Sequence, residues 1–213
     1  MKIAFIGTHS VGKTTLIEQF LSKWPMYTKA ESTYRDLIKQ NKLKINKKGT
    51  EESQRIILNS LIDEVQNVTA KGSARVVFDR CVVDNIAYTL WLNAHKKVSD
   101  EFVDECKTIA AETLKLYDII FYLPVHESIP LTKKSGRDSD PVYREELDNI
   151  FDALITSYEK GTGRFFPLSD CPAVIRLDMS PAARCEQIGL YIQHTGECFD
   201  EKEPSLIEPY IKQ

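Results

Sequence analysis

The chain has 213 residues, which is enough for one large domain with a substantial core and short for two independent domains. Hydrophobic residues make up 42% of it and charged residues 28%, a balance typical of globular proteins rather than of disordered, fibrous or membrane proteins. The net charge of -3 excludes a global basic field, so binding to duplex nucleic acid by charge alone is not expected.

The cysteines and the apolar runs indicate the compartment. Five cysteines are odd in number, widely spaced and without a CxxC pair, which argues against a disulfide framework or a structural zinc site. The apolar run after Met1 ends at Gly7, too early for a signal peptide, and no later run approaches the length of a membrane span. We therefore expect a soluble cytoplasmic protein with no membrane partner.

Short, nearly continuous apolar runs predict strands that are buried on both faces, as in a parallel sheet. They occupy residues 2–6, 74–79, 118–123 and 173–178, with a weaker candidate at 27–30. Segments with apolar residues at helical spacing separate these runs, and three of them begin at the caps Thr50, Ser99 and Asp140. Strands that alternate with helices predict a doubly wound α/β fold.

The segment GTHSVGKT at residues 7–14 matches the phosphate-binding pattern GxxxxGK[ST] between a predicted strand and a predicted helix. Gly7 and Gly12 let the backbone curl so that its N–H groups converge on the phosphates of a nucleotide. Lys13 is expected to follow the charge of the β- and γ-phosphates, Thr14 to ligate Mg²⁺, and Thr15 to add a second phosphate contact. The other loop residues act mainly through their backbone: Thr8, His9, Ser10 and Val11. The motif predicts binding of Mg-ATP.

A second polar group follows the strand predicted at residues 74–79, at the sheet edge where ligands bind in open α/β sheets. Asp79 can hold Mg²⁺ opposite Thr14, and Arg80 can contact a phosphate of the donor or the acceptor. Asp84 has two interpretations, which are a hydrogen bond to an acceptor hydroxyl and an N-cap of the next helix.

Four segments of the chain resemble segments of the P-loop nucleoside and nucleotide kinases and occur in the same order as in that family. Within this family the chain is most similar to the bacterial nicotinamide riboside kinase domain and its phage relatives, an AAA-type ATP-binding domain of the kinase class. The segments are residues 7–14, ESTYR at 31–35, FDRCVVDNIAY at 78–88 and GRDSDPVYREELD at 136–148. The resemblance covers most of the chain. It implies a five-stranded parallel sheet in the order 2-3-1-4-5 with helices on both faces, and a kinase domain at residues 1–195 with a helical lid at about 126–165. A polar tail at 196–213 follows.

The resemblance also implies roles for individual residues. Glu31 becomes the general base for an attacking hydroxyl, and Arg35 becomes a residue that binds the substrate. A surface ion pair between Glu31 and Arg35 is the alternative, and Asp79 is a competing candidate for the base. Arg137 and Arg144 become lid arginines that contact the nucleotide phosphates, with Arg137 preferred because Arg144 can pair with acidic residues of its own helix.

The acceptor is expected to be a nucleoside- or nucleotide-type small molecule that receives the γ-phosphate of ATP. Gln54 falls in a segment that would line its pocket, together with the aromatic residues Tyr34, Tyr88 and Trp91. The oligomeric state is open between monomer and homodimer.

Three other functions are weighed against this one. A kinase acting on a hydroxymethylated base in DNA is an alternative, because Lys42, Lys44, Lys47 and Lys48 would form a local basic patch; a solvated lysine-rich loop is favoured over nucleic-acid binding. A P-loop ATPase or a nucleotide-binding regulatory module is the alternative of another class. A switch GTPase is disfavoured because the chain has no NKxD signature.

Overall fold

A computed structural model describes residues 1–31, 34–131, 138–162, 165–167 and 169–199 of the chain, without the side chains of Tyr34 and Arg35. Its centre is a five-stranded parallel sheet in the order β2-β3-β1-β4-β5, which confirms the order implied by the resemblance. The strands are β1 (Lys2–Ile6), β2 (Thr28–Lys29), β3 (Val76–Asp79), β4 (Ile119–Tyr122) and β5 (Ala173–Arg176). Each strand lies within a run that the sequence predicted, and β2 to β5 are shorter than those runs.

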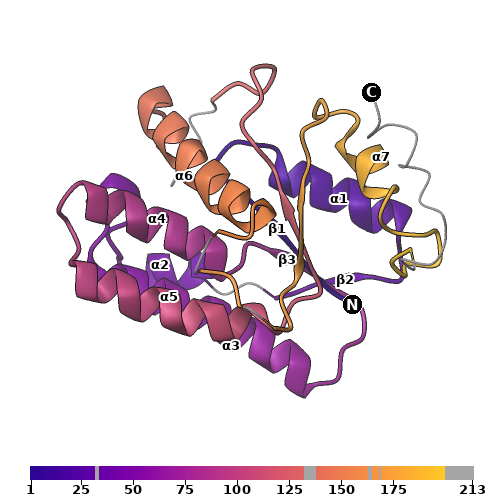
Figure 1. Cartoon of the computed structure of the whole chain (residues 1–213), viewed down its shortest axis with the longest axis horizontal. Coiled ribbons are helices and arrows are strands. Elements are labelled where there is room, and N and C mark those ends of the chain that lie inside the picture. Colours follow the sequence, from indigo (N-terminus) through magenta and orange to yellow (C-terminus); the bar gives the residue numbers. More distant parts are fainter. Residues whose placement is uncertain (32–33, 132–137, 163–164, 168, 200–213) are drawn as a thin grey trace.

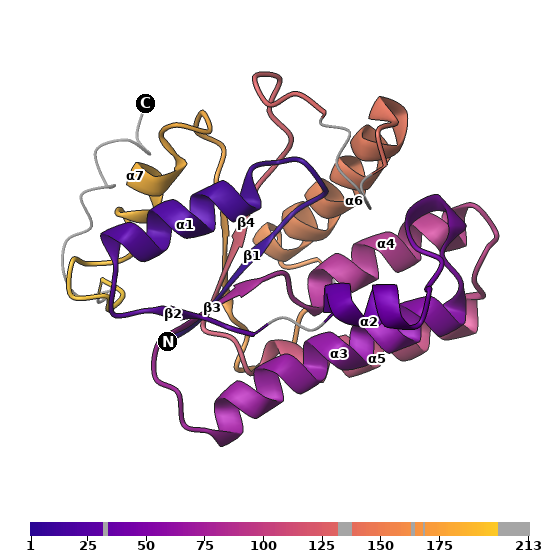
Figure 2. The same cartoon turned by 180° about the vertical axis from the view of Figure 1, so that it is seen from behind.

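Helices cover both faces of the sheet (Figures 1 and 2). On one face lie α1 and α7, and on the other lie α3, α4, α5 and α6, while α2 packs on α3. The helices are α1 (Lys13–Lys23), α2 (Tyr34–Gln40), α3 (Glu51–Ala70), α4 (Val82–Ala94), α5 (Asp100–Leu114), α6 (Pro141–Glu159) and α7 (Arg184–Ile188), with a 3₁₀ helix η1 (Asn46–Lys48). The three-layer α/β prediction is therefore confirmed. None of the described helices is long and apolar enough to span a membrane.

The central strand β1 shows how the sequence serves two cores at once. Ile3 and Phe5 point toward α1, whereas Ala4 and Ile6 point toward the helices of the other face, and all four are fully buried. On the α1 side the ring of Phe5 contacts Phe20, with centroids 5.7 Å apart. A strand segment buried on both faces needs apolar residues at every position, which is why residues 3–6 are all apolar.

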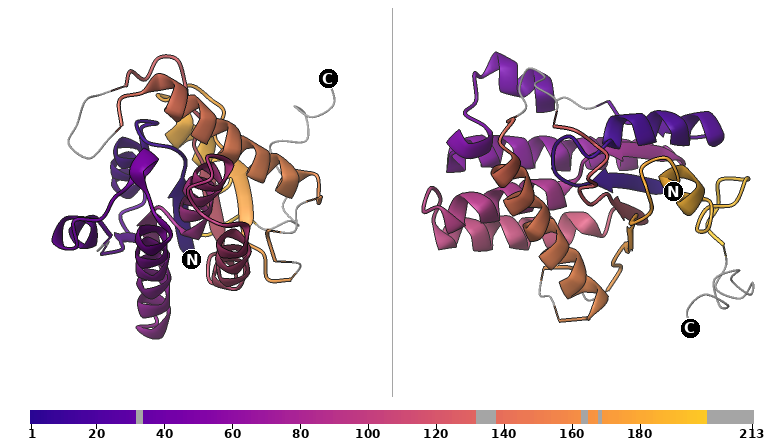
Figure 3. Two further views of the ribbon diagram at one scale, coloured as in Figure 1. Left: turned by 90° about the vertical axis from the view of Figure 1, so that its left-hand side faces the viewer. Right: turned by 90° about the horizontal axis from the view of Figure 1, so that it is seen from above.

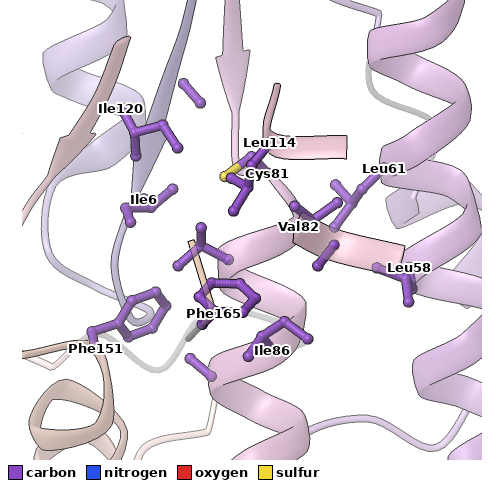
Figure 4. Packing of buried hydrophobic residues seen from close by; sticks show 14 of the residues in the cluster. Ile6, Leu58, Leu61, Cys81, Val82, Ile86, Leu114, Ile120, Phe151 and Phe165 are labelled. Atoms are coloured by element: carbon purple, nitrogen blue, oxygen red, sulfur yellow. The ribbon is translucent and has the colours of Figure 1, made fainter. Parts of the chain in front are cut away.

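The larger core joins α3, α4, α5 and α6 to the sheet (Figure 4). Helix α6 contributes four fully buried side chains along its length, and it lies against α4 (Figure 3). These side chains are Tyr143, Leu147, Phe151 and Ile155. The helix that the resemblance assigned to a lid is thus anchored in the core over most of its length.

Side-chain caps fix the helix starts that position the site. Thr50 and Ser53 form a reciprocal capping box at the start of α3, and the Asp140 carboxylate accepts from Val142 N at 2.9 Å with Pro141 in the first turn of α6. The Ser99 hydroxyl accepts from Phe102 N at 3.2 Å. All three predicted caps are confirmed.

The chain after α7 folds back on the α1 side of the molecule. The Tyr27 hydroxyl donates to Gly196 O at 2.7 Å, and the Trp24 ring N–H donates to Gln193 O at 2.7 Å. The first residues of the predicted tail therefore hydrogen-bond to the domain, and residues 200–213 lie outside the described part.

Candidate functional site

A cavity of about 930 Å³ opens at the carboxyl edge of the sheet. Its walls come from the loop between β1 and α1, the end of β3, the first turns of α4, one face of α3 and residues 129–130. Eleven of the predicted site residues line this cavity: His9, Ser10, Val11, Gly12, Lys13, Thr14, Thr15, Gln54, Asp79, Arg80 and Asp84. The topology alone brings them together, because parallel strands end at one edge.

The loop at residues 7–14 has the bent backbone that its glycines predict. Gly7 has φ +137° and Gly12 has φ +90°, both in the region that favours glycine. A Cβ on Gly7 would lie 2.5 Å from the carbonyl oxygen of Leu123, so no other residue fits there. The sequence requires glycine at this position for space as well as for conformation.

Lys13 is buried and folds back on its own loop. Its Nζ donates hydrogen bonds to the carbonyl oxygens of Gly7 and of Thr8, the latter at 2.7 Å. These bonds hold the ammonium in the cavity wall. It lies beside the space in which N–H groups of the loop could donate to phosphate oxygens.

Two arginines from distant elements contact the carbonyl oxygens of the same loop. Arg144 of α6 donates to Ile129 O at 3.2 Å and, more weakly, to Ser10 O at 3.5 Å. The acidic residues of its own helix, Asp140 and Asp148, accept hydrogen bonds from other groups. Of the two predicted lid arginines, Arg144 therefore reaches the loop, while Arg137 lies outside the described residues.

The second arginine, Arg184 of α7, was not assigned to the site by the sequence. It is 2% exposed, and its guanidinium donates to Val11 O at 2.9 Å and to Pro124 O at 2.7 Å. Its contact with the loop spans 173 positions of the chain. No spacing rule predicts such a contact.

His9 is a buried, neutral member of the loop. Its ring stacks on Tyr143 of α6, and its Nδ1 lies 3.3 Å from the hydroxyl of Thr8. Burial, together with the cations of Arg80 and Lys13, lowers the pKa of His9 to about 4. Among the described residues its Nε2 has no hydrogen-bond partner.

Asp79 ends β3 as a buried carboxylate. The Nζ of Lys29, at the end of β2, lies 3.7 Å from its Oδ2. Asp79 and Thr14 line the same cavity, and one carboxylate with one hydroxyl fits Mg²⁺, which keeps waters and takes further oxygens from phosphates. The described residues contain no cluster of three His, Cys, Asp or Glu side chains that would hold a metal without such help.

Arg80 and Asp84 form a partly buried ion pair with Nη1 and Oδ1 2.9 Å apart. Asp84 also accepts from Cys81 N at 3.1 Å and thereby completes the capping box of α4, whose N-cap is Cys81. Of the two interpretations of Asp84, the N-cap is therefore wrong, because Asp84 is the third residue of the helix. The hydrogen bond to an acceptor hydroxyl stays a prediction. Burial raises the pKa of the Asp84 carboxyl, and Arg80 and Lys13 oppose that rise.

Gln54 of α3 lines the cavity, and its side-chain amide has a fixed orientation. Asn85 Nδ2 donates to the backbone carbonyl of Gln54 and to its Oε1, both at 2.9 Å. Since only the NH₂ group of Asn85 can donate to a carbonyl, Gln54 must present its oxygen to Asn85. The NH₂ group of Gln54 is left to face other partners.

Glu31 and Trp91, two of the predicted residues with described side chains, do not line the cavity. Glu31 is exposed and is absent from the described residues that line it, and the side chain of Arg35 lies outside the described part. Trp91 is buried in the packing between α4 and α6, where its ring contacts Tyr143 with centroids 4.6 Å apart. Tyr88 does line the cavity, as predicted.

The lysine-rich segment is partly engaged within the protein. Lys47 in η1 donates to Asp140 at the start of α6 at 2.9 Å and lies 3.6 Å from Asp138. Lys42, Lys44 and Lys48 are exposed or nearly so. Three of the four lysines are therefore exposed to solvent, and the fourth, Lys47, is held in an ion pair.

Comparisons with known proteins agree with this fold. The model of a family described as AAA domain matches residues 2–161. A search of curated proteins found no match. Deoxyadenosine kinase from M. mycoides with bound dATP superposes with a TM-score of 0.63 at 20% identity, over 88% of this chain and 96% of that one. Thymidylate kinase from Candida albicans gives 0.63 at 16% identity, over 94% and 95%.

A third similar structure is NadR protein in complex with NR, with a TM-score of 0.61 at 15% identity. The superposition covers 93% of this chain and 52% of the NadR chain, so this chain spans about half of the length of NadR. At these identities the likeness establishes a shared P-loop fold.

Proposed function

The chain belongs to the AAA domain family, and from this premise we propose that it is an ATP-dependent kinase which passes the γ-phosphate to a nucleoside- or nucleotide-type small molecule. One observation carries the proposal. The phosphate-binding loop and the Gln54–Asn85 pair are walls of the same cavity, whose volume of about 930 Å³ suits a nucleotide and a small acceptor side by side.

The donor half of the reaction rests on the loop. Lys13 would exchange the carbonyl oxygens of its own loop for the β- and γ-phosphates, and the loop N–H groups would hold the remaining oxygens. Thr14 and Asp79 would hold Mg²⁺, which neutralises phosphate charge when bound. Arg80 and Arg144 stand at the cavity wall and beside the loop, where cations stabilise the charge on the moving phosphoryl group.

The acceptor half rests on α3, α4 and the segment after β2. The hydroxyl oxygen of the acceptor would attack the γ-phosphorus, the bond to the β-phosphate oxygen would break, and ADP would leave. Glu31 is our assignment for the base that takes the hydroxyl proton. Gln54 would donate its NH₂ group to a ring acceptor atom, and Tyr88 would pack against the ring.

The nature of similar structures supports this acceptor class. Two of the proteins with the same fold are, by their names, kinases of a nucleoside and of a nucleotide. A kinase of a hydroxymethylated base in DNA stays as the alternative. The exposed Lys42, Lys44 and Lys48 support it, since Ile45 and Asn46 between them in the sequence line the cavity, and the ion pair that engages Lys47 weakens it. An ATPase or regulatory module is the alternative of another class.

A panel assay tests the proposal. Purified protein is incubated with Mg²⁺, γ-labelled ATP and one acceptor at a time: nucleosides, nucleoside monophosphates, nicotinamide riboside and hydroxymethylated DNA. Label on a small nucleoside or nucleotide, lost in the Lys13→Ala variant, supports the proposal. Label only on DNA supports the first alternative, and release of labelled phosphate without any labelled acceptor supports an ATPase.

A further inference from the structure

Arg184 is a buried cation that touches the back of the phosphate-binding loop. Its guanidinium donates to Val11 O at 2.9 Å and to Pro124 O, directly beyond β4, at 2.7 Å. Its Nε has no hydrogen-bond partner among the described residues, and Arg184 forms no salt bridge with any of them. Burial lowers the pKa of this guanidinium.

Such an arrangement is a poor device for stability alone. A buried charge that bonds only to carbonyl oxygens and leaves one N–H unsatisfied retains much of its desolvation cost. An apolar side chain would fill the same space between α7 and the loop without that cost. The contact therefore calls for an explanation in the loop itself.

The geometry of the peptide bond supplies the explanation. In a trans peptide the C=O and the next N–H lie in one plane and point in opposite directions. A donor that fixes Val11 O on the outer side of the loop thereby turns the N–H of Gly12 to the inner side, and Gly12 lines the cavity. A cation on the carbonyl also polarises the peptide unit, which strengthens the N–H as a donor.

We propose that Arg184 is a positioning residue which aims the Gly12 N–H at a nucleotide phosphate and adds a fixed positive charge behind the loop. The inference rests on the proposed use of the loop for a nucleotide and goes beyond it. Arg184 touches no substrate, so it acts on binding of the donor through the Val11–Gly12 peptide.

The side chain is held rigidly enough for this role. Gln187, one turn later in α7, donates to Arg176 O at 3.1 Å and to Asp178 Oδ1 at 2.9 Å, and its Oε1 accepts from Met179 N at 3.2 Å. These bonds fasten α7 to the end of β5. The loop is thereby braced against the sheet through β4 and, by way of α7, through β5.

The test compares two arginines that lie eight positions apart. Arg184→Met keeps the apolar stem and removes the donors, Arg184→Lys keeps the charge and one donor, and Arg176→Met is the matched control, since Arg176 pairs with Asp152 and Glu159 away from the loop. Binding of ATP, GTP and inorganic tripolyphosphate is measured by calorimetry with Mg²⁺. KM is measured separately for ATP and for the acceptor found in the panel assay.

For Arg184→Met we expect affinity to fall about tenfold or more, equally for ATP, GTP and tripolyphosphate, with KM for the acceptor unchanged. Arg184→Lys recovers part of the loss, and Arg176→Met binds as the wild type does. If Arg184→Met does not fold, Arg184→Lys decides alone, through a smaller loss with the same pattern.

If Arg184→Met folds and binds the three ligands as tightly as the wild type, the inference is overturned and the proposed kinase stands. If only Arg184→Lys folds, wild-type affinity in that variant has the same meaning. An equal loss in Arg176→Met also overturns it, since the effect would then be general destabilisation. If the wild-type protein itself binds none of the three ligands, the proposed function fails first.

Discussion

The imidazole of His9 stacks on the phenol ring of Tyr143, with centroids 5.7 Å apart and an interplanar angle of 27°. This contact joins the phosphate-binding loop to α6. The residues on the same face of α6 as Tyr143, which are Leu147, Phe151 and Ile155, are buried in the core. The histidine is neutral because burial and the neighbouring cations hold its pKa at about 4. The loop and the helix therefore share a contact that protonation would disrupt.

We predict a pH dependence of stability that His9 causes. Its pKa is about 4 when folded and about 6.5 when unfolded, so between these values the unfolded chain binds more protons and stability falls as the pH is lowered. The loss is fully developed near pH 4, absent above about pH 6.5, and on the order of 3 kcal/mol. Urea unfolding across this range, compared for wild type, His9→Phe and the exposed control His194→Phe, measures it. An unchanged slope in His9→Phe would contradict the prediction.

Replacement of Gly7 by alanine should damage both folding and binding. The residue has φ +137°, and the new Cβ would meet the Leu123 carbonyl at 2.5 Å, so we expect a loss of about 2–4 kcal/mol in the free energy of unfolding and no measurable nucleotide affinity. Gly72→Ala is the matched control: it has φ +65° but open space around it, and should cost only about 1 kcal/mol. Equal losses in the two variants would show that the clash is unimportant.

Lys13→Ala should abolish phosphate transfer. If the ammonium follows the charge of the γ-phosphate, its removal is felt mainly in the transition state, and we expect kcat to fall at least about a hundredfold, toward the detection limit. Lys23→Ala, at the exposed end of the same helix, is the control. Transfer by Lys13→Ala at the control rate would remove Lys13 from the mechanism.

Glu31→Gln tests the assignment of the base. If the carboxylate takes the acceptor proton, turnover should drop by about two to four orders of magnitude, while the affinity for ATP by calorimetry stays nearly unchanged. Glu52→Gln, an exposed change of the same kind in α3, is the control. Unchanged turnover in Glu31→Gln would direct attention to Asp79, the competing base.

Gln54→Leu tests the acceptor wall. The amide is oriented by Asn85, and its loss removes a donor from a buried site, so KM for the acceptor should rise about tenfold or more while KM for ATP stays constant. Gln66→Leu, on the exposed face of the same helix, is the control. A rise in KM for ATP alone would place Gln54 on the donor side.

Much of the fold follows from local pattern and from the resemblance. The run at residues 2–6 had to be a strand buried on both faces, and Thr50 and Asp140 cap the helices they were expected to cap. The loop at residues 7–14 is predictable because its motif is local in the sequence. It needs glycine where the backbone bends, and a lysine and a threonine where the helix starts.

The missed features are those that depend on packing between distant elements. Arg184 meets Val11 only after β5 and α7 are in place, and nothing near residue 184 marks that contact. Asp84 carries a common signal for an N-cap, but Cys81 takes that position because the chain turns directly after Arg80, which has φ +102°. Trp91 looked suitable for an acceptor pocket, yet the approach of α6 buries it against Tyr143.

In the proposed function, the bonds from Lys13 to the carbonyl oxygens of Gly7 and Thr8 make nucleotide binding an exchange of contacts rather than a simple addition. Two internal contacts have to be given up before the ammonium can turn to a phosphate, and the abandoned oxygens must be rehydrated or find new donors. Calorimetric heats of nucleotide binding will consequently understate the strength of the phosphate contacts themselves, because the empty protein begins from a state in which its main cation is already satisfied.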